Sequence, residues 1–234
     1  MKLLALDCST EACSVALGLD GEVIELFELA PRSHTQRLLP MVDKLLTQTG
    51  VKLAELDAIS FGRGPGSFTG LRICLGAVQG LAFGAQLPVL PISSLAVLAQ
   101  TALESQQVSE SGLILSSFDA RMDEIYWGLF RCEGAVVQAA AAEQLCAPEQ
   151  LQLPAECRNS DGVSIVGSGW NYCDRIAPLD HTLSIESQLL PRASALLTLA
   201  RAAFSAGAAL PASEALPVYL RDQVAWNKPA AIPS

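Results

Sequence analysis

A glycine-rich stretch at residues 62–72 constrains the fold of this chain more than any other feature. It reads Gly-Arg-Gly-Pro-Gly-Ser-Phe-Thr-Gly-Leu-Arg. The apolar run 56–61 before it predicts a buried strand, and the apolar segment 73–84 after it predicts a helix. Glycines permit backbone conformations that a Cβ would block, and Ser67 or Thr69 can cap the helix. The sequence therefore predicts a strand–loop–helix turn.

Two interpretations of this loop remain open, a phosphate site at a helix N-terminus and a tight structural turn with a good cap. It is not a Walker A loop, because no Lys-Ser/Thr follows its last glycine. It is not the dinucleotide fingerprint, because Gly70 lies one residue too far from Gly66. Pro65 occupies the place of the first glycine in a nucleophile elbow, which excludes that motif as well.

The helix predicted after the loop has two different sides. At about 100° per residue, an apolar stripe and a small-residue stripe face opposite ways. The apolar stripe is Leu71, Leu75, Val78 and Ala82, and the other is Ile73, Gly76, Gly80 and Gly84. A small residue at every fourth position lets another backbone approach closely. We expect this helix to pack on its own sheet and also against another helix, of the same domain or of a partner.

Composition limits the classes of function. The 234 residues suffice for one large or two small domains, and half of them are hydrophobic, so we expect a sizeable core. A net charge of −9 argues against a protein that holds nucleic acid by its own field. The seven cysteines include no C-x-x-C pair, as expected of buried thiols in a reducing compartment. Asp7 interrupts the N-terminal apolar run, so we expect no signal peptide.

Residues 73–103 carry no charge, which is also a property of membrane spans. Glutamine, serine and proline interrupt this stretch repeatedly. We therefore expect a helix, a short strand at 87–90 and a second helix at 93–103, all buried.

The chain opens with three predicted strands, Lys2–Asp7, Ala12–Leu19 and Glu22–Leu29, the last two joined by an Asp-Gly hairpin signal. They predict an antiparallel meander. The turn between the first two contains Asp7, Ser9 and Thr10. Such a turn can hold a magnesium-bound phosphate, and the same residues are also ordinary turn formers.

A helix is predicted at 33–49, with Gly50 as its stop and Pro40 marking either a kink or a late start. Its apolar residues cover an arc of about 160°, wider than one core contact needs. They are Leu38, Leu39, Met41, Val42, Leu45 and Leu46. This arc indicates either a second packing partner or a fully buried helix.

The second half of the chain repeats the opening pattern. After a polar linker at 104–111, strands are predicted at 113–118, 124–130 and 135–137, with turns between them. This weak internal repeat indicates two copies of one α/β fold. We expect one domain at 1–105, carrying the partner-binding helices, and another at 106–234. A further strand is expected at 163–166, a helix at 192–207 that packs back on the first domain, and a frayed C-terminus.

Four segments together identify a family. They are 4–10 (Leu-Ala-Leu-Asp-Cys-Ser-Thr), 34–40 (His-Thr-Gln-Arg-Leu-Leu-Pro), 64–72 and 219–221 (Tyr-Leu-Arg). In this order they resemble the TsaB (YeaZ) family of bacterial tRNA threonylcarbamoyladenosine biosynthesis proteins. The segment 64–72 is shared with the catalytic paralogue TsaD, whereas 34–40, 219–221 and the short length favour TsaB.

The resemblance implies an actin-like ATPase (ASKHA) fold of two related domains, each with a mixed sheet flanked by helices. It also implies a cytoplasmic complex with TsaD and the small ATPase TsaE. That complex transfers a threonylcarbamoyl group from its adenylate to N6 of adenosine 37 in tRNAs that read codons beginning with A. Within it, this chain is expected to be a non-catalytic scaffold that contacts tRNA only indirectly and forms a homodimer when alone.

The residues agree with a non-catalytic role. TsaD holds its metal through two histidines one helical turn apart, whereas this chain has only His34 and His181. We therefore expect no metal site, no catalytic residue and no cofactor of its own, with nucleotide bound weakly or at the complex interface. An alternative is an actin-like ATPase or small-molecule kinase, although the region 116–121 lacks the glycines of a second phosphate loop. Nothing in the chain supports a peptidase.

Two sets of site residues follow. The degenerate phosphate loop is expected to comprise Asp7, Ser9, Thr10, Gly64, Gly66 and Ser67. The partner-binding face is expected to comprise His34, Leu38, Leu39, Met41, Val42, Leu45, Ile73, Gly76, Ala77, Gly80 and Gly84. His34 is expected at the start of its helix or in the interface rather than as a base.

Overall fold

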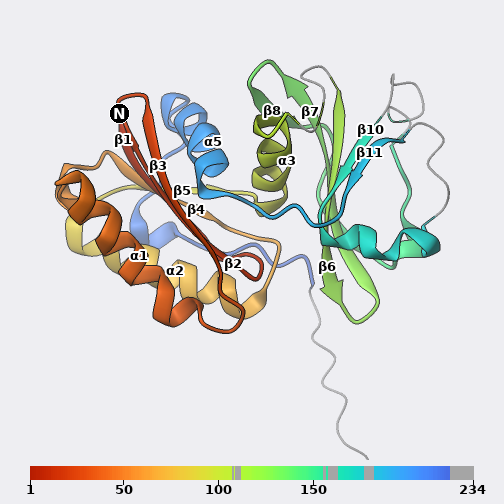
Figure 1. The fold of residues 1–234 in the computed structure, drawn as a ribbon, viewed down its shortest axis with the longest axis horizontal. Coiled ribbons are helices and arrows are strands. Elements are labelled where there is room, and N and C mark those ends of the chain that lie inside the picture. Colours follow the sequence, from red (N-terminus) through yellow and green to blue (C-terminus); the bar gives the residue numbers. More distant parts are fainter. Residues whose placement is uncertain (107, 109–111, 155–156, 158–162, 177–181, 222–234) are drawn as a thin grey trace, which may run out of the picture.

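The computed structural model describes residues 1–106, 108, 112–154, 157, 163–176 and 182–221. His181 and the residues after 221 lie outside this part. Two sheets lie side by side, with helices α3 (Ser94–Glu104) and α5 (Ala193–Ser205) between them (Figure 1). Helices α1 (His34–Thr49) and α2 (Phe68–Ala85) cover the outer face of the first sheet.

The first sheet has five strands in the order β3-β2-β1-β4-β5. They are β1 (Lys2–Asp7), β2 (Ala12–Leu19), β3 (Glu22–Leu29), β4 (Ala58–Gly62) and β5 (Val89–Ile92). The first three form the predicted antiparallel meander, while β4 pairs with β1 and β5 in parallel. Strands β1, β2 and β4 are buried along almost their whole length, which explains their continuous apolar runs.

The second sheet repeats this topology, with the order β8-β7-β6-β10-β11. Its strands are β6 (Leu113–Arg121), β7 (Glu124–Glu133), β8 (Val136–Ala139), β10 (Val163–Val166) and β11 (Thr182–Glu186), and β9 (Gln144–Cys146) adds to β7. Here too an antiparallel hairpin pair adjoins two parallel strands. The predicted internal repeat is confirmed, although β9 and β11 were not expected. The domain boundary at 105 and 106 stays a prediction.

The helices begin and end close to the predicted positions. Helix α1 runs through Pro40 without a late start and ends at Gly50, whose φ of 68° is left-handed. Helix α2 begins after Ser67, whose hydroxyl accepts a hydrogen bond from the Gly70 amide at 3.3 Å. Four 3₁₀ turns complete the described helical segments: Leu53–Glu55, Pro148–Gln150, Ser168–Arg175 and Ala212–Glu214.

Three apolar clusters fill the layers. One joins the first sheet to α1 and α2, a second surrounds α3 and α5, and a third lies on the other face of the second sheet around Trp127 and Trp170. Helix α3 is almost wholly buried, as predicted, but α2 is not. By length and composition alone α2 could cross a membrane, yet its buried residues pack on β4, β1 and α1.

Candidate partner face and phosphate-loop region

The glycine-rich loop between β4 and α2 uses its amides within the chain. The Ser67 amide donates to the Ser9 carbonyl at 2.7 Å, and the Gly64 amide donates to Ser94 Oγ at 3.1 Å. The amide of Gly70 donates to the Ser67 hydroxyl. Amides that donate to protein oxygens are not free to hold phosphate oxygens, so these three do not form an open cradle.

The glycines of this loop are needed for close packing. A Cβ on Gly66 would lie 2.4 Å from the Ser9 carbonyl oxygen, and one on Gly70 would lie 2.0 Å from the Cys8 carbonyl oxygen. Gly64 has a φ of 100°, and its Cβ would lie 2.8 Å from the Val218 carbonyl oxygen. The structure thus brings the predicted loop onto the β1–β2 turn, in the geometry of a tight structural turn.

Asp7 lies at the centre of this contact and is 1% exposed. Its Oδ1 accepts from the Ser9 amide at 2.9 Å and from the Ser9 hydroxyl at 2.7 Å. Its Oδ2 is buried and has no partner among the described residues. Burial raises the pKa of this carboxyl above its usual value. Thr10, the remaining member of the set, caps the same turn by accepting from the Ala12 amide.

The small-residue stripe of α2 faces solvent. Apart from the helix's own backbone, no atom of the described residues lies within 4 Å of a Cβ placed on Gly76, Gly80 or Gly84. The opposite side of α2 is buried and contains Leu71, Cys74, Val78 and Ala82. The predicted packing of α2 on its own sheet is therefore confirmed, with Leu75 of the predicted apolar stripe half-buried. Within the described residues no helix of the same domain covers the three glycines.

Helix α1 uses most of its wide apolar arc for its own core. Leu38, Met41, Val42 and Leu45 are buried in the cluster beneath α1 and α2. His34 is 6% exposed, and its Nε2 lies 3.2 Å from the Ala12 carbonyl oxygen. These five side chains were expected on the partner face, and the structure corrects their placement. A helix lying flat on a sheet beside a second helix buries more than one stripe.

The remaining members of the predicted face are accessible. Leu39 is 50% exposed, and Ile73 and Ala77 are half-buried. Phe83 was not predicted as part of this face, and it is 81% exposed between Gly80 and Gly84. Its place three residues after Gly80 was the available signal, because positions three apart share a helix face. We call Leu39, Ile73, Gly76, Ala77, Gly80, Phe83 and Gly84 the α1–α2 face.

The segment that contains Tyr219 and Arg221 connects the two halves. The Arg72 guanidinium lies 3.8 Å from the ring centroid of Phe68, and its Nε donates to the Tyr219 hydroxyl at 3.2 Å. Arg221 reaches the turn between β6 and β7, where its Nη2 donates to the Ala120 carbonyl at 3.2 Å and pairs with Glu124. This segment therefore bridges the first turn of α2 and the second sheet.

No cluster of three metal-ligating side chains occurs in the part of the chain that the structure describes. Of the seven cysteines, five are buried, Cys146 is half-buried and Cys173 is exposed. The expected predominance of buried thiols holds for most of the set.

Known proteins resemble this chain over nearly its whole length. The model of the TsaD family, tRNA N6-adenosine threonylcarbamoyltransferase, matches residues 27–228. The tRNA threonylcarbamoyladenosine biosynthesis protein TsaB of Escherichia coli is 41% identical over 97% of this chain and 98% of its own length. TsaB of Haemophilus influenzae is 42% identical, with 97% of each chain covered. The solved structure of YeaZ from Pseudomonas aeruginosa has a TM-score of 0.87 and 46% identity, and the match covers 94% of this chain and 99% of that one.

Proposed function

Since this chain belongs to the TsaB (YeaZ) family of tRNA threonylcarbamoyladenosine biosynthesis proteins, with the actin-like fold of that family, we propose that it is a non-catalytic scaffold. In this proposal it acts in the cytoplasm with TsaD and TsaE. Together they transfer threonylcarbamoyl from its adenylate to N6 of adenosine 37 in tRNAs that read codons beginning with A. TsaD binds the chain directly, and TsaE joins through that pair.

One observation carries this proposal: the uncovered glycine stripe of α2. Each glycine in a helix interior costs about 1 kcal/mol relative to alanine, and three of them stand at spacing four on an exposed surface. Phe83 on the same helix and Leu39 on α1 are exposed large apolar side chains. Such a surface suits a second helix that approaches closely. The related fold of TsaD supplies a partner of matching shape, and a second copy of this chain serves when TsaD is absent.

The closed phosphate loop supports a role without chemistry. Its amides donate to Ser9 and Ser94, and Asp7 Oδ1 is occupied by Ser9. In the second half, the Asp119 side chain accepts from the Arg121 amide at 2.8 Å and pairs with its guanidinium. The alternative, an ATPase or kinase acting alone, therefore has the weaker support.

Copurification with TsaD and a tRNA modification assay test the scaffold. Gly80→Leu places a side chain where the two backbones would approach, and it removes a poor helix former. We expect this variant to melt like the unmodified protein but to lose self-association, TsaD binding and stimulation of modification. Ser205→Leu adds the same side chain at an exposed position of α5 and is the control. A folded Gly80→Leu that still binds TsaD normally would place the interface elsewhere.

An ATPase measurement tests the alternative. The isolated protein should not hydrolyse ATP, and nucleotide should bind only weakly or at the complex interface. Hydrolysis at several turnovers per second, abolished by Asp7→Ala, would establish the chain as an enzyme in its own right.

A further inference from the structure

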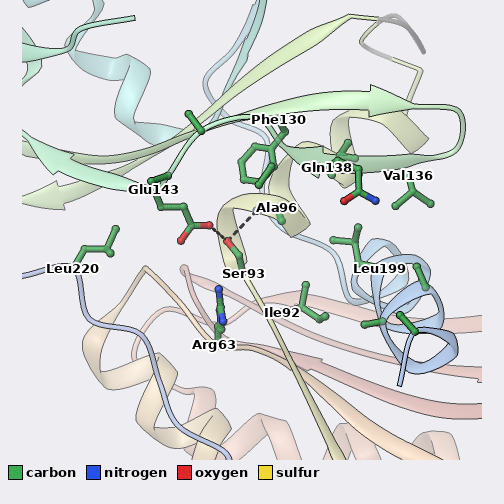
Figure 2. Close-up of a pocket in the computed structure, with 17 residues that line it drawn as sticks. Arg63, Ile92, Ser93, Ala96, Phe130, Val136, Gln138, Glu143, Leu199 and Leu220 are labelled. Carbon is green, nitrogen blue, oxygen red and sulfur yellow. Dashed lines mark hydrogen bonds between the residues drawn. The ribbon is translucent and has the colours of Figure 1, made fainter. Parts of the chain in front are cut away.

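A cavity of about 660 Å³ lies between the two halves, away from the α1–α2 face (Figure 2). Its walls come from the loop after β4, the start of α3, β8, the segment 141–143 and the C-terminal half of α5. Its volume lies within the range of small-molecule sites, about 300–1,000 Å³. The cavity combines one polar end with an otherwise mostly apolar lining.

Arg63 stands at the polar end and points into the cavity (Figure 2). Its Nε is buried and has no hydrogen-bond partner, and no ion pair to its guanidinium occurs among the described residues. The backbone of Arg63 is fixed, because its amide donates to Ile92 and its carbonyl accepts from Val218, both at 2.8 Å. Arg63 as a whole is half-buried, but a buried N–H group without a hydrogen-bond partner is costly, and the best partner of an arginine side chain is a planar carboxylate. The Nε group of Arg63 therefore lacks an acceptor.

Glu143 limits which anion fits. Its Oε1 accepts a hydrogen bond from Ser93 Oγ, which also accepts from the Ala96 amide. Burial raises the pKa of this carboxyl, against the hydrogen bond from Ser93 and the nearby Arg63 charge, which lower it. When Glu143 is ionised, a singly charged carboxylate bound to Arg63 meets the repulsion of a single charge. A doubly charged phosphate beside it would meet stronger repulsion.

Apart from Gln138 on β8, the rest of the lining is mostly hydrocarbon. Phe130, Val136 and Leu199 face the space opposite Arg63, and three small alanines of β8 and α5 leave it open. An apolar chain bound there would lose contact with water on several sides.

We propose that this cavity binds a monocarboxylate with an apolar chain. The carboxylate lies on the Arg63 guanidinium beside Glu143, and the chain lies on Phe130, Val136 and Leu199. This site is independent of the proposed scaffold function, because none of its lining residues belongs to the α1–α2 face.

Calorimetric titration of the full-length protein with octanoate tests the site. Octanoate should bind at a single site per chain, and Arg63→Gln should weaken it at least tenfold while octanol binding changes less than twofold. Arg32→Gln removes an exposed arginine outside the cavity and should leave the affinity unchanged. Ala203→Phe should abolish binding of both ligands by filling the cavity, and its melting temperature shows whether it folds. Equal octanoate binding by Arg63→Gln, or no binding by the unmodified protein, would overturn the proposal.

Selectivity gives a second readout. The unmodified protein should prefer octanoate to octyl phosphate by at least tenfold at neutral pH. Glu143→Gln should narrow this preference, because it removes the group that repels the second charge. If octyl phosphate binds more tightly than octanoate to the unmodified protein, the site is a phosphate site and the proposed ligand class is wrong.

Discussion

Asp7 shows how a single buried carboxyl can oppose stability. Its folded-state pKa is raised by burial, so the folded state binds a proton more tightly than the unfolded state. Stability therefore falls as pH rises from the unfolded pKa of about 3.9 through the folded pKa. Asp7→Asn removes the titrating carboxyl and with it this loss of stability. At pH 7 we expect the variant to be more stable by about 1–2 kcal/mol.

Thermal unfolding at several pH values checks this expectation. The advantage of Asp7→Asn should grow as pH rises from about 4 and then level off. Asp43→Asn, at an exposed position of α1, should show no such trend. An asparagine variant that is less stable at pH 7 would mean that the folded protein compensates the Asp7 charge.

Two glycines of α2 lie in opposite environments, one packed against backbone and one open to solvent. A Cβ on Gly70 would lie 2.0 Å from the Cys8 carbonyl, whereas one on Gly76 meets nothing within 4 Å. Gly70→Ala should therefore destabilise the protein by about 3 kcal/mol or more, and Gly76→Ala should stabilise it by about 1 kcal/mol. Urea unfolding of both variants measures the difference. If Gly76→Ala destabilises the chain, that position is packed within the fold.

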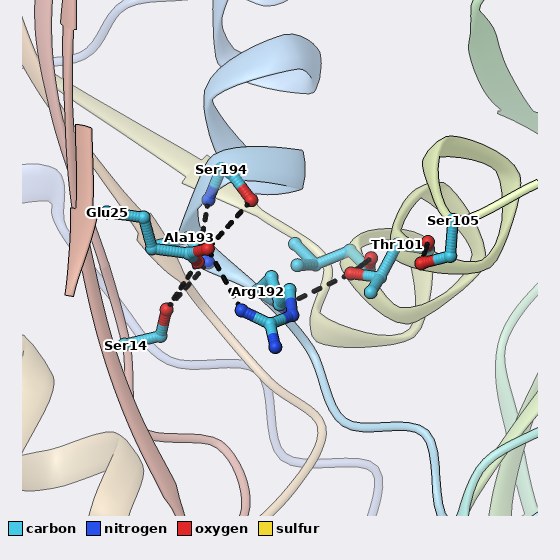
Figure 3. A network of polar contacts seen from close by, with 8 residues as sticks. Ser14, Glu25, Thr101, Ser105, Arg192, Ala193 and Ser194 are labelled. Atoms are coloured by element: carbon cyan, nitrogen blue, oxygen red, sulfur yellow. Dashed lines mark hydrogen bonds and ion pairs between the residues drawn. The ribbon is translucent and has the colours of Figure 1, made fainter. Parts of the chain in front are cut away.

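At the level of elements, the start of α5 is held by a carboxylate from another strand. Glu25 on β3 accepts from the Ser14 hydroxyl and the Ser194 amide, and it pairs with Arg192 at 3.1 Å (Figure 3). It takes the place of a capping side chain at the α5 N-terminus, where Arg192 makes no side-chain cap.

Removing this carboxylate should loosen α5 from the first sheet. Glu25 is 16% exposed, so we expect Glu25→Ala to cost about 2–3 kcal/mol. Glu28 lies on the same strand and pairs with Arg37, but it is 39% exposed, and Glu28→Ala should cost clearly less. Chemical denaturation of the two variants measures the two losses in unfolding free energy. Equal losses would show that the Glu25 network contributes no more than a surface ion pair.

The sequence predicted the helices and strands better than it predicted the contacts between them. Local patterns were sufficient for the meander, for α2 and for the repeat, because each depends on neighbours in the chain. The repeat extends further than expected: Gly167 packs on the Ser117 carbonyl as Gly66 packs on the Ser9 carbonyl. Periodicity could not show which apolar residues of α1 face the sheet, because the width of an apolar arc does not identify what packs against each part of it. The cavity at Arg63 could not be predicted either, because segments far apart in the sequence form it.

At the scale of the whole molecule, the net charge determines how strongly we expect the isolated chain to bind tRNA. The chain carries a net charge of −9, and several described arginines already pair with carboxylates of the same chain. The salt-dependent attraction of cations to phosphates supplies most non-specific binding to nucleic acid. An acidic molecule with its arginines paired lacks that source of affinity.

The isolated protein should therefore bind tRNA with a dissociation constant above about 1 μM at about 150 mM salt, weaker than specific nucleic-acid complexes. Filter binding over a range of salt concentrations measures the affinity and the slope. Repeating the titration with TsaD present is the control: under the proposed scaffold role, tRNA should be retained through TsaD. A submicromolar constant for the isolated chain, with a steep loss of affinity at higher salt, would reveal a local basic patch that outweighs the net charge, and tRNA would then be a direct partner of this subunit.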